Sequence, residues 1–282
     1  MRHYLSLIKF SHTVFALPFA VIGYFLGIKD AGTGFDLQLF IKVVLCMVFA
    51  RTAAMAFNRY ADRKVDARNE RTRVREIPSG KVKPLQALAL VLLSSTAFIL
   101  VTYSINPLCF YLSPVALGVI LGYSYTKRFT WLCHIVLGIG LALAPVGSYL
   151  AVTGAFSLVP VLFSSAVITW VSGFDIIYAM QDETFDRQEN LYSLPASFGG
   201  RRALKVAGFL HLISILAVVI AGIELEADWI YWSGAAIFGL LLLRQHRLVR
   251  PDDLSRVDLA FFTLNGIASV IFGTLVVLSL LY

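Results

Sequence analysis

Long apolar stretches alternate with short polar stretches along the whole chain of 282 residues. Each apolar stretch is close to the roughly 20 residues that an α-helix needs to cross the hydrocarbon of a bilayer. The pattern therefore predicts nine membrane-spanning helices, at residues 11–28, 36–57, 84–103, 107–125, 132–152, 157–181, 203–223, 229–245 and 259–281.

The composition supports this interpretation, because 58% of the residues are hydrophobic and only 15% are charged. Soluble domains are about 45–50% apolar and about 25% charged. No polar stretch is long enough for a separate soluble domain, and the first apolar run has no cleavage site of a signal peptide behind it. We expect an all-α, polytopic membrane protein that folds as a single domain over residues 1–282.

The basic residues are distributed asymmetrically around the predicted spans. Of the 24 Lys and Arg residues, 21 lie in the N-terminal segment and in loops 58–83, 126–131, 182–205 and 244–258, which nine crossings place on one side. The positive-inside rule makes that side cytoplasmic, in the inner membrane of the cell. Anionic headgroups of membrane lipids account for the net charge of +7 without any nucleic acid.

The most highly charged stretch, FNRYADRKVDARNERTRVREIPSG, covers residues 57–80. Asn58, Asp62 and Asp66 are four residues apart, so a helix places them on one face with a drift of about 40° per step. Carboxylate and amide oxygens suit Mg²⁺ together with phosphate oxygens, and the forked side chains of Arg71 and Arg75 suit phosphate. Taken alone, the stretch also fits a solvated helix end with paired charges.

A second acidic pair, Asp182 and Asp186, repeats the spacing at the end of the sixth predicted span. The second and sixth spans run in the same direction, so both acidic pairs reach the same membrane face. Four converging carboxylates repel one another unless cations balance them. We predict two Mg²⁺ ions that hold a diphosphate between Asp62 and Asp66 on one side and the second pair on the other.

Tyr123 and Lys127 are also four residues apart, at the same face and at the end of the fourth span. We expect Lys127 to reach a phosphate and Tyr123 to donate to a phosphate or leaving oxygen, although both residue types are also common interface anchors. Asp175 lies seven residues before Asp182, inside a span, where an ionisable group is costly. It either binds a polar substrate, takes a proton, or pairs with Arg51 of the second span.

Together these motifs resemble the UbiA superfamily of intramembrane prenyltransferases over essentially the whole chain. The family has nine helices and two Asp-rich motifs. The flanks KFSHTVFALP, RTRVREIPSG and YAMQDETFDRQENLYSLP most resemble 4-hydroxybenzoate polyprenyltransferase-like proteins of bacterial quinone synthesis. The positions that match the family motifs are Asn58, Asp62, Asp66, Arg71, Arg75, Pro78, Gly80, Tyr123, Lys127, Asp182 and Asp186.

The resemblance implies Mg²⁺-dependent transfer of a polyprenyl group from polyprenyl diphosphate to a ring carbon of an aromatic acid, such as 4-hydroxybenzoate, in ubiquinone or menaquinone synthesis. Cations that neutralise the diphosphate help the allylic bond to ionise, and an aromatic face can steady the resulting cation. The carboxylate of the acceptor needs a cationic partner, for which Lys9 and Arg51 are the candidates.

Three features depart from the family pattern: Arg59 follows the motif Asn, Glu76 follows Arg75, and no Lys follows Asp186. These variants resemble a branch proposed to prenylate 6-amino-carboxynaphthoate in the futalosine route to menaquinone, so the acceptor stays open. A membrane transporter is the alternative class. It would place polar groups near the bilayer midplane on broken helices, whereas here the acidic pairs lie at one face.

Overall fold

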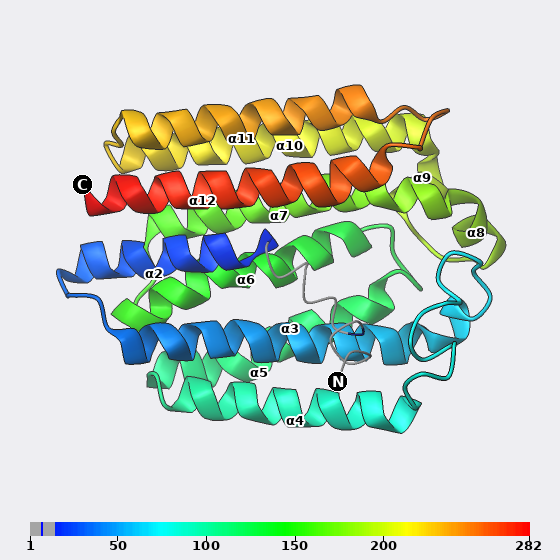
Figure 1. The fold of residues 1–282 in the computed structure, drawn as a ribbon, viewed down its shortest axis with the longest axis horizontal. Helices are drawn as coiled ribbons and strands as arrows, with labels where there is room; N and C mark the ends of the chain where they lie inside the picture. Colours follow the sequence, from blue (N-terminus) through cyan, green and yellow to red (C-terminus); the bar gives the residue numbers. More distant parts are fainter. Residues whose placement is uncertain (1–6, 8–14) are drawn as a thin grey trace.

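The computed structural model describes residue 7 and residues 15–282, and in this part of the chain the ordered segments are helical apart from one isolated bridge. The long helices lie side by side in one bundle (Figure 1). They are α2 (Leu17–Ala31), α3 (Leu37–Asp66), α4 (Pro84–Tyr103), α5 (Pro107–Thr126), α6 (Cys133–Thr153), α7 (Leu158–Ala179), α10 (Gly200–Glu224), α11 (Trp229–Leu248) and α12 (Asn265–Leu281).

Seven helical segments of the described residues are long and apolar enough to cross a membrane. They are α3, α4, α5, α6, the segment that begins with α7, α10, and the segment that ends with α12. The prediction of an all-α, multi-pass membrane protein is therefore confirmed. Helices α2, of 15 residues, and α11, which ends in a polar turn with His246 and Arg247, coincide with the other two predicted spans.

Side-chain caps mark where several helices begin. The Asp36 carboxylate accepts hydrogen bonds from the backbone N–H groups of Gln38 (2.8 Å) and Leu39 (3.1 Å) at the start of α3. The Asn106 side chain accepts from the N–H of Cys109 (2.8 Å) at the start of α5. Such caps satisfy N–H groups that lack partners inside the helix, so the polar residues between the apolar runs define where each span starts.

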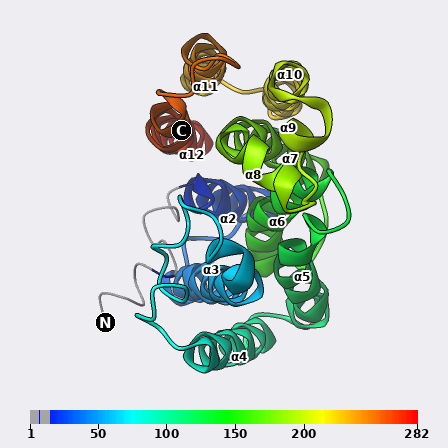
Figure 2. The same ribbon diagram turned by 90° about the vertical axis from the view of Figure 1, so that its right-hand side faces the viewer.

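The core of the bundle lies where α7 packs against α6 and α10, and α2 packs against α6. Viewed along the helices, α2 to α6 form one part of the bundle, and α7 and α10 to α12 form the other (Figure 2). Trp170 of α7 is fully buried between Phe19 and Phe238, with ring centroids 5.5 and 5.7 Å away. A Cβ at Gly23 would collide with the carbonyl oxygen of Pro145, so the absent side chain lets α2 approach α6 closely.

The last predicted span is not a uniform α-helix. Its first turn, η3 (Leu259–Leu264), is π-helical and precedes α12. The amide of Asn265 donates to the carbonyl oxygens of Ala260 (3.2 Å) and Phe261 (3.0 Å), while its oxygen accepts from Trp170 Nε1 (2.8 Å) and Gln245 Nε2 (2.6 Å). This buried amide binds carbonyls of the widened turn, and π-turns of this kind are frequent at functional sites.

The sixth predicted span also ends irregularly. After α7 the chain forms a 3₁₀ turn, η2 (Met180–Asp182), and then the short helices α8 (Glu183–Gln188) and α9 (Leu194–Phe198). These elements and the loop after α3 lie together at one end of the bundle, the right-hand end in Figure 1. The acidic motifs lie at this end.

Candidate active site

The first acidic motif occupies the last turns of α3. Asn58, Asp62 and Asp66 lie on one face, as predicted, and all three line a polar cavity of about 200 Å³. The Asn58 amide donates to Asp62 Oδ2 at 3.0 Å, and Asp66 is the last residue of the helix. Asp66 is buried, with 4% of its surface exposed.

The second motif meets the first across this cavity. Asp182 ends the 3₁₀ turn and Asp186 lies in α8, and both carboxylates line the cavity with those of α3. Ser193 donates its hydroxyl to Asp186 Oδ2 at 2.9 Å. The two motifs are far apart in the sequence, and the structure brings them together as the span directions predicted.

Each of the four motif carboxylates pairs with a cationic side chain of the chain itself. The Asp182 pair is made by Arg71, whose Nε donates to Asp182 Oδ1 at 3.0 Å. The other pairs are Asp66–Arg75 (2.7 Å), Asp186–Lys127 (2.7 Å) and Asp62–Arg128 (3.3 Å). Four negative and four positive groups thus balance one another around a partly buried cavity.

Burial of Lys127 works against its charge, but the attraction and hydrogen bond of Asp186, with the further attraction of Asp182, outweigh it and raise the pKa of Lys127. Arg71 behaves in the same way: burial is outweighed by the hydrogen bond and charge of Asp182, which raise the pKa of Arg71. Both cations are therefore firmly charged, and both can exchange a carboxylate for a phosphate oxygen.

The residues that sequence reasoning missed hold these groups in place. The Asn69 amide donates to Asp182 Oδ1 (3.0 Å), and the Tyr178 hydroxyl accepts from Arg71 Nη1 (2.9 Å). Arg128 also donates to the carbonyl oxygen of Ala61 at 2.7 Å. None of these residues has a diagnostic spacing, and only their proximity to the motifs in the sequence singles them out.

The donor set of the cavity fits a divalent cation. Among the described residues, no three His, Cys, Asp or Glu side chains come close enough to hold a metal ion together, because each motif carboxylate is drawn to a cation. However, Asp66 Oδ2 is buried without a hydrogen-bond partner, which is costly for a carboxylate oxygen. Hard oxygen donors with one unsatisfied carboxylate oxygen suit Mg²⁺.

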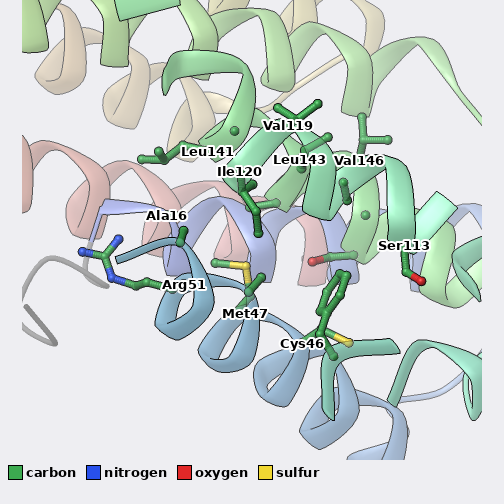
Figure 3. Close-up of a pocket in the computed structure, with 18 of the residues that line it drawn as sticks. Ala16, Cys46, Met47, Arg51, Ser113, Val119, Ile120, Leu141, Leu143 and Val146 are labelled. Atoms are coloured by element: carbon green, nitrogen blue, oxygen red, sulfur yellow. The ribbon is translucent and has the colours of Figure 1, made fainter. Parts of the chain in front are cut away.

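A second, apolar cavity of about 470 Å³ adjoins the polar one. It extends between α3, α5 and α6, with Arg51 at one end and Cys46 and Ser113 at the other (Figure 3). Tyr123 and Asp175 line both cavities, so the two spaces meet there. One face of α3 continues from the apolar cavity past Arg51 to the acidic motif.

Three of the aromatic rings that line the apolar cavity contact one another. The ring centroids of Phe15 and Phe174 lie 5.7 Å apart, those of Phe15 and Phe261 5.9 Å, and those of Phe174 and Phe261 5.2 Å. Phe261 also stacks on Tyr178 with a centroid distance of 4.2 Å. The π-turn therefore contributes directly to the wall of the apolar cavity.

The structure also locates two of the three remaining residues that the sequence singled out. Asp175 Oδ2 lies 2.7 Å from His134 Nδ1, so a histidine of α6 is its hydrogen-bond partner. Arg51 lines the apolar cavity. Lys9 lies outside the described residues.

Two of the departures from the family pattern contact each other. Arg59 Nε lies 3.8 Å from Glu76 Oε2, and both side chains are buried, with 4% and 10% of their surfaces exposed. Arg59 lies on α3 and Glu76 in the loop that follows it. The two substitutions therefore form one matched ion pair beside the acidic motif.

The comparisons with known proteins agree with this geometry. The UbiA prenyltransferase family model matches residues 16–267. The chain is 31% identical to a 4-hydroxybenzoate octaprenyltransferase of Aeromonas hydrophila subsp. hydrophila over 86% of this chain and 84% of that protein. A similar enzyme of Nitrosospira multiformis is 32% identical over 85% of this chain and 82% of that protein.

Solved structures match the same fold. A UbiA homolog from Aeropyrum pernix K1 superposes with a TM-score of 0.86 at 32% identity, covering 95% of this chain and 97% of that chain. A UbiA homolog from Archaeoglobus fulgidus bound to GPP and Mg²⁺ has a TM-score of 0.75 at 20% identity, covering 99% and 100%. The chain belongs to the UbiA prenyltransferase family, and it is a membrane-embedded prenyltransferase.

Proposed function

We propose that this enzyme transfers a polyprenyl group from polyprenyl diphosphate to a ring carbon of an aromatic acid, with 4-hydroxybenzoate as the first candidate, in quinone biosynthesis. The observation that carries the proposal is the pair of adjoining cavities. The four motif carboxylates and their four cationic partners line the polar cavity, and an apolar cavity large enough for isoprene units begins at Tyr123 and Asp175. The two relatives named above are 4-hydroxybenzoate octaprenyltransferases by name, which supports the acceptor and the transferred group.

The residues that would hold Mg²⁺ are Asn58, Asp62, Asp66, Asp182 and Asp186, which line the polar cavity. When bound, the metal would neutralise the diphosphate as it leaves. Arg71, Arg75 and Lys127 then turn from their carboxylates toward phosphate oxygens, which keeps charge balanced in a partly buried site. Tyr123 is placed to donate to a phosphate or to the leaving oxygen, since it lines both cavities.

The apolar cavity receives the isoprenoid tail, and the rings of Phe15, Phe174 and Phe261 face the allylic cation that forms at its mouth. Arg51 is the cationic partner for the acceptor carboxylate among the described residues that line this cavity, and Lys9 remains a second candidate. The proposal includes nine membrane crossings, with α2 and α11 as the additional two, and one domain over 1–282. It also places the site at the cytoplasmic face of the inner membrane, because the basic loops lie at this end.

A second acceptor, 6-amino-carboxynaphthoate, is favoured by the Arg59–Glu76 pair. The two residues that depart from the commoner family pattern are matched to each other in a buried contact, so they form one feature of the site region. This is the feature expected of a distinct branch of the family.

The test uses membranes that contain the expressed protein, Mg²⁺ and a radiolabelled polyprenyl diphosphate, with each acceptor offered separately. We expect labelled product with one acceptor, and its loss with a chelator and in Asp62→Asn. Lack of product with both acceptors, in membranes that still bind the diphosphate in an Mg²⁺-dependent way, would refute both acceptors and leave the donor site. Lack of diphosphate binding would refute the donor site itself.

A further inference from the structure

Asp175 lies at the point where the two cavities meet. It lines the polar cavity with the motif carboxylates and the apolar cavity with Phe174, and 23% of its side chain is exposed toward this space. In the proposed function, on which this inference depends, the bond that breaks joins the diphosphate to the first isoprene carbon. That carbon therefore lies at the junction, and the ring that attacks it must be next to Asp175.

The carboxylate of Asp175 is held by a buried histidine with a defined proton position. His134 Nδ1 lies 2.7 Å from Asp175 Oδ2, and His134 Nε2 lies 3.2 Å from the backbone nitrogen of Leu194. A backbone N–H is a donor only, so Nε2 must accept and the ring proton lies on Nδ1, donated to Asp175. A doubly protonated ring would place two N–H donors against each other.

The chain segment that fixes His134 is the one that carries the second acidic motif. Leu194 follows Ser193, whose hydroxyl donates to Asp186 at 2.9 Å. His134 itself is almost completely buried, with 3% of its side chain exposed. It lines the polar cavity, but Asp175 and the Leu194 N–H engage both of its ring nitrogens. Its role is therefore to orient Asp175 and to keep one carboxylate oxygen engaged, which leaves the other for a ligand.

We infer that Asp175, oriented by His134, recognises an O–H or N–H group on the aromatic acceptor beside the ring carbon that is prenylated, and holds its proton during bond formation. A hydroxyl or amino group directs an electrophile to the adjacent ring carbon. The group therefore lies close to the allylic carbon and hence close to Asp175. Both 4-hydroxybenzoate and 6-amino-carboxynaphthoate carry such a donor, which gives them one common mode of recognition.

Groups of the site and the two substrates account for every proton and electron pair of the reaction. The allylic C–O bond breaks, and its electron pair leaves with the diphosphate. The ring carbon forms the new C–C bond while the hydroxyl becomes a ring carbonyl and its proton moves to Asp175. The proton on the prenylated ring carbon then passes to the released diphosphate, the ring regains aromaticity, and Asp175 returns its proton to the oxygen. For an amino group the same steps pass through a ring imine.

The experiment compares acceptors with and without the donor group, using purified protein, Mg²⁺ and labelled polyprenyl diphosphate. The pairs are 4-hydroxybenzoate with 4-methoxybenzoate, and 6-amino- with 6-dimethylamino-carboxynaphthoate. We expect the wild type to prefer the donor-bearing member of the pair that it accepts by about 100-fold or more in kcat/KM, in the range of general acid–base effects. Asp175→Asn should reduce kcat/KM for that member about 100-fold and abolish the preference, with the KM for the diphosphate within about threefold of wild type.

His134→Phe should weaken the preference through a lower kcat, and His134→Gln should restore most of it, because a glutamine amide can donate to Asp175 and accept from Leu194. The exposed Asp252 supplies the matched control, Asp252→Asn, which should keep the wild-type preference. Equal losses on both members of a pair in Asp175→Asn, or no preference in the wild type, would overturn this inference alone. A wild type that binds the diphosphate but prenylates no member of either pair would overturn the proposed acceptors, and this inference with them.

Discussion

The Arg59–Glu76 pair gives the most exacting test of the structural reasoning, because both of its members are buried. At 3.8 Å, and with an effective dielectric constant of about 20, two unit charges attract by about 4 kcal/mol. Removal of one partner leaves the other charge buried and uncompensated, a change that costs about 3–5 kcal/mol. Removal of both partners leaves no buried charge behind.

We therefore expect Arg59→Met and Glu76→Gln each to lower the free energy of unfolding by about 3–4 kcal/mol, and the double variant to lose only about 1–2 kcal/mol. For a chain of this size 1 kcal/mol corresponds to roughly 2–4 °C. The single variants should thus unfold roughly 6–16 °C below wild type, and the double variant should recover most of this loss. The measurement is the apparent Tm of purified protein in detergent, at one scan rate.

The matched control is the Arg68–Glu189 pair, which is shorter at 2.8 Å but leaves 59% of the Arg68 side chain exposed. Because solvent screens exposed pairs, Arg68→Met and Glu189→Gln should show a coupling energy below about 1 kcal/mol. A double variant Arg59→Met/Glu76→Gln whose loss equals the sum of the single losses would refute the assignment of these residues as one pair.

Further predictions concern the polar cavity and the packing around α7. Asp62→Asn should lower turnover at least about 100-fold while the Tm changes little, since Asp62 is the most exposed of the paired motif carboxylates; a variant with near-normal turnover would contradict its role. Lys127→Met removes the partner of Asp186, so it should increase the rise in Tm that Mg²⁺ alone produces. The same variant should raise the KM for the diphosphate about tenfold or more. An equal rise in Tm with Mg²⁺ in wild type and in Lys127→Met would contradict the Lys127–Asp186 pairing. Because the pKa of Lys127 is raised, its stabilising contribution is complete below the ordinary lysine pKa and is lost only as pH rises through the raised value. The difference in Tm between wild type and Lys127→Met should therefore stay constant from about pH 7 to about pH 9, and a decline within that range would contradict it. Gly173→Ala should cost about 1–3 kcal/mol, because its Cβ would collide with the His211 ring, whereas Gly208→Ala, with its nearest atom at 3.7 Å, should be nearly neutral.

The sequence predicted the long helices and the face of the first acidic motif, because both depend on periodicity. Apolar runs of helix-spanning length mark the helices, and the four-residue spacing places Asn58, Asp62 and Asp66 on one face. The direction of the spans then brings Asp182 and Asp186 to the same end. These predictions need only the chain's local geometry and the thickness of a bilayer.

Contacts between elements could not be predicted in the same way. The pairing of Asp175 with His134 depends on how α6 packs against α7, and the pairing of Arg59 with Glu76 depends on the course of the loop after α3. Lys127 was expected on a phosphate, and in the structure it pairs with Asp186. Periodicity identifies the face on which a side chain lies, but packing decides which partner it contacts.

The length of α3 has a consequence for how the substrates are supplied. Its 30 residues rise about 45 Å, roughly 15 Å more than the hydrocarbon of a typical bilayer. Because the charged residues of α3 lie at its C-terminal end, we expect the acidic motif to reach headgroup height, with the apolar cavity beginning one to two turns lower on the same helix. Under the proposed function, the polyprenyl donor reacts without lifting its chain out of the membrane, so we expect it to arrive by diffusion in two dimensions and the aromatic acid to arrive from water. The donor term in the rate law should then scale with the mole fraction of donor in the bilayer, and dilution with inert lipid should slow the enzyme at constant bulk concentration.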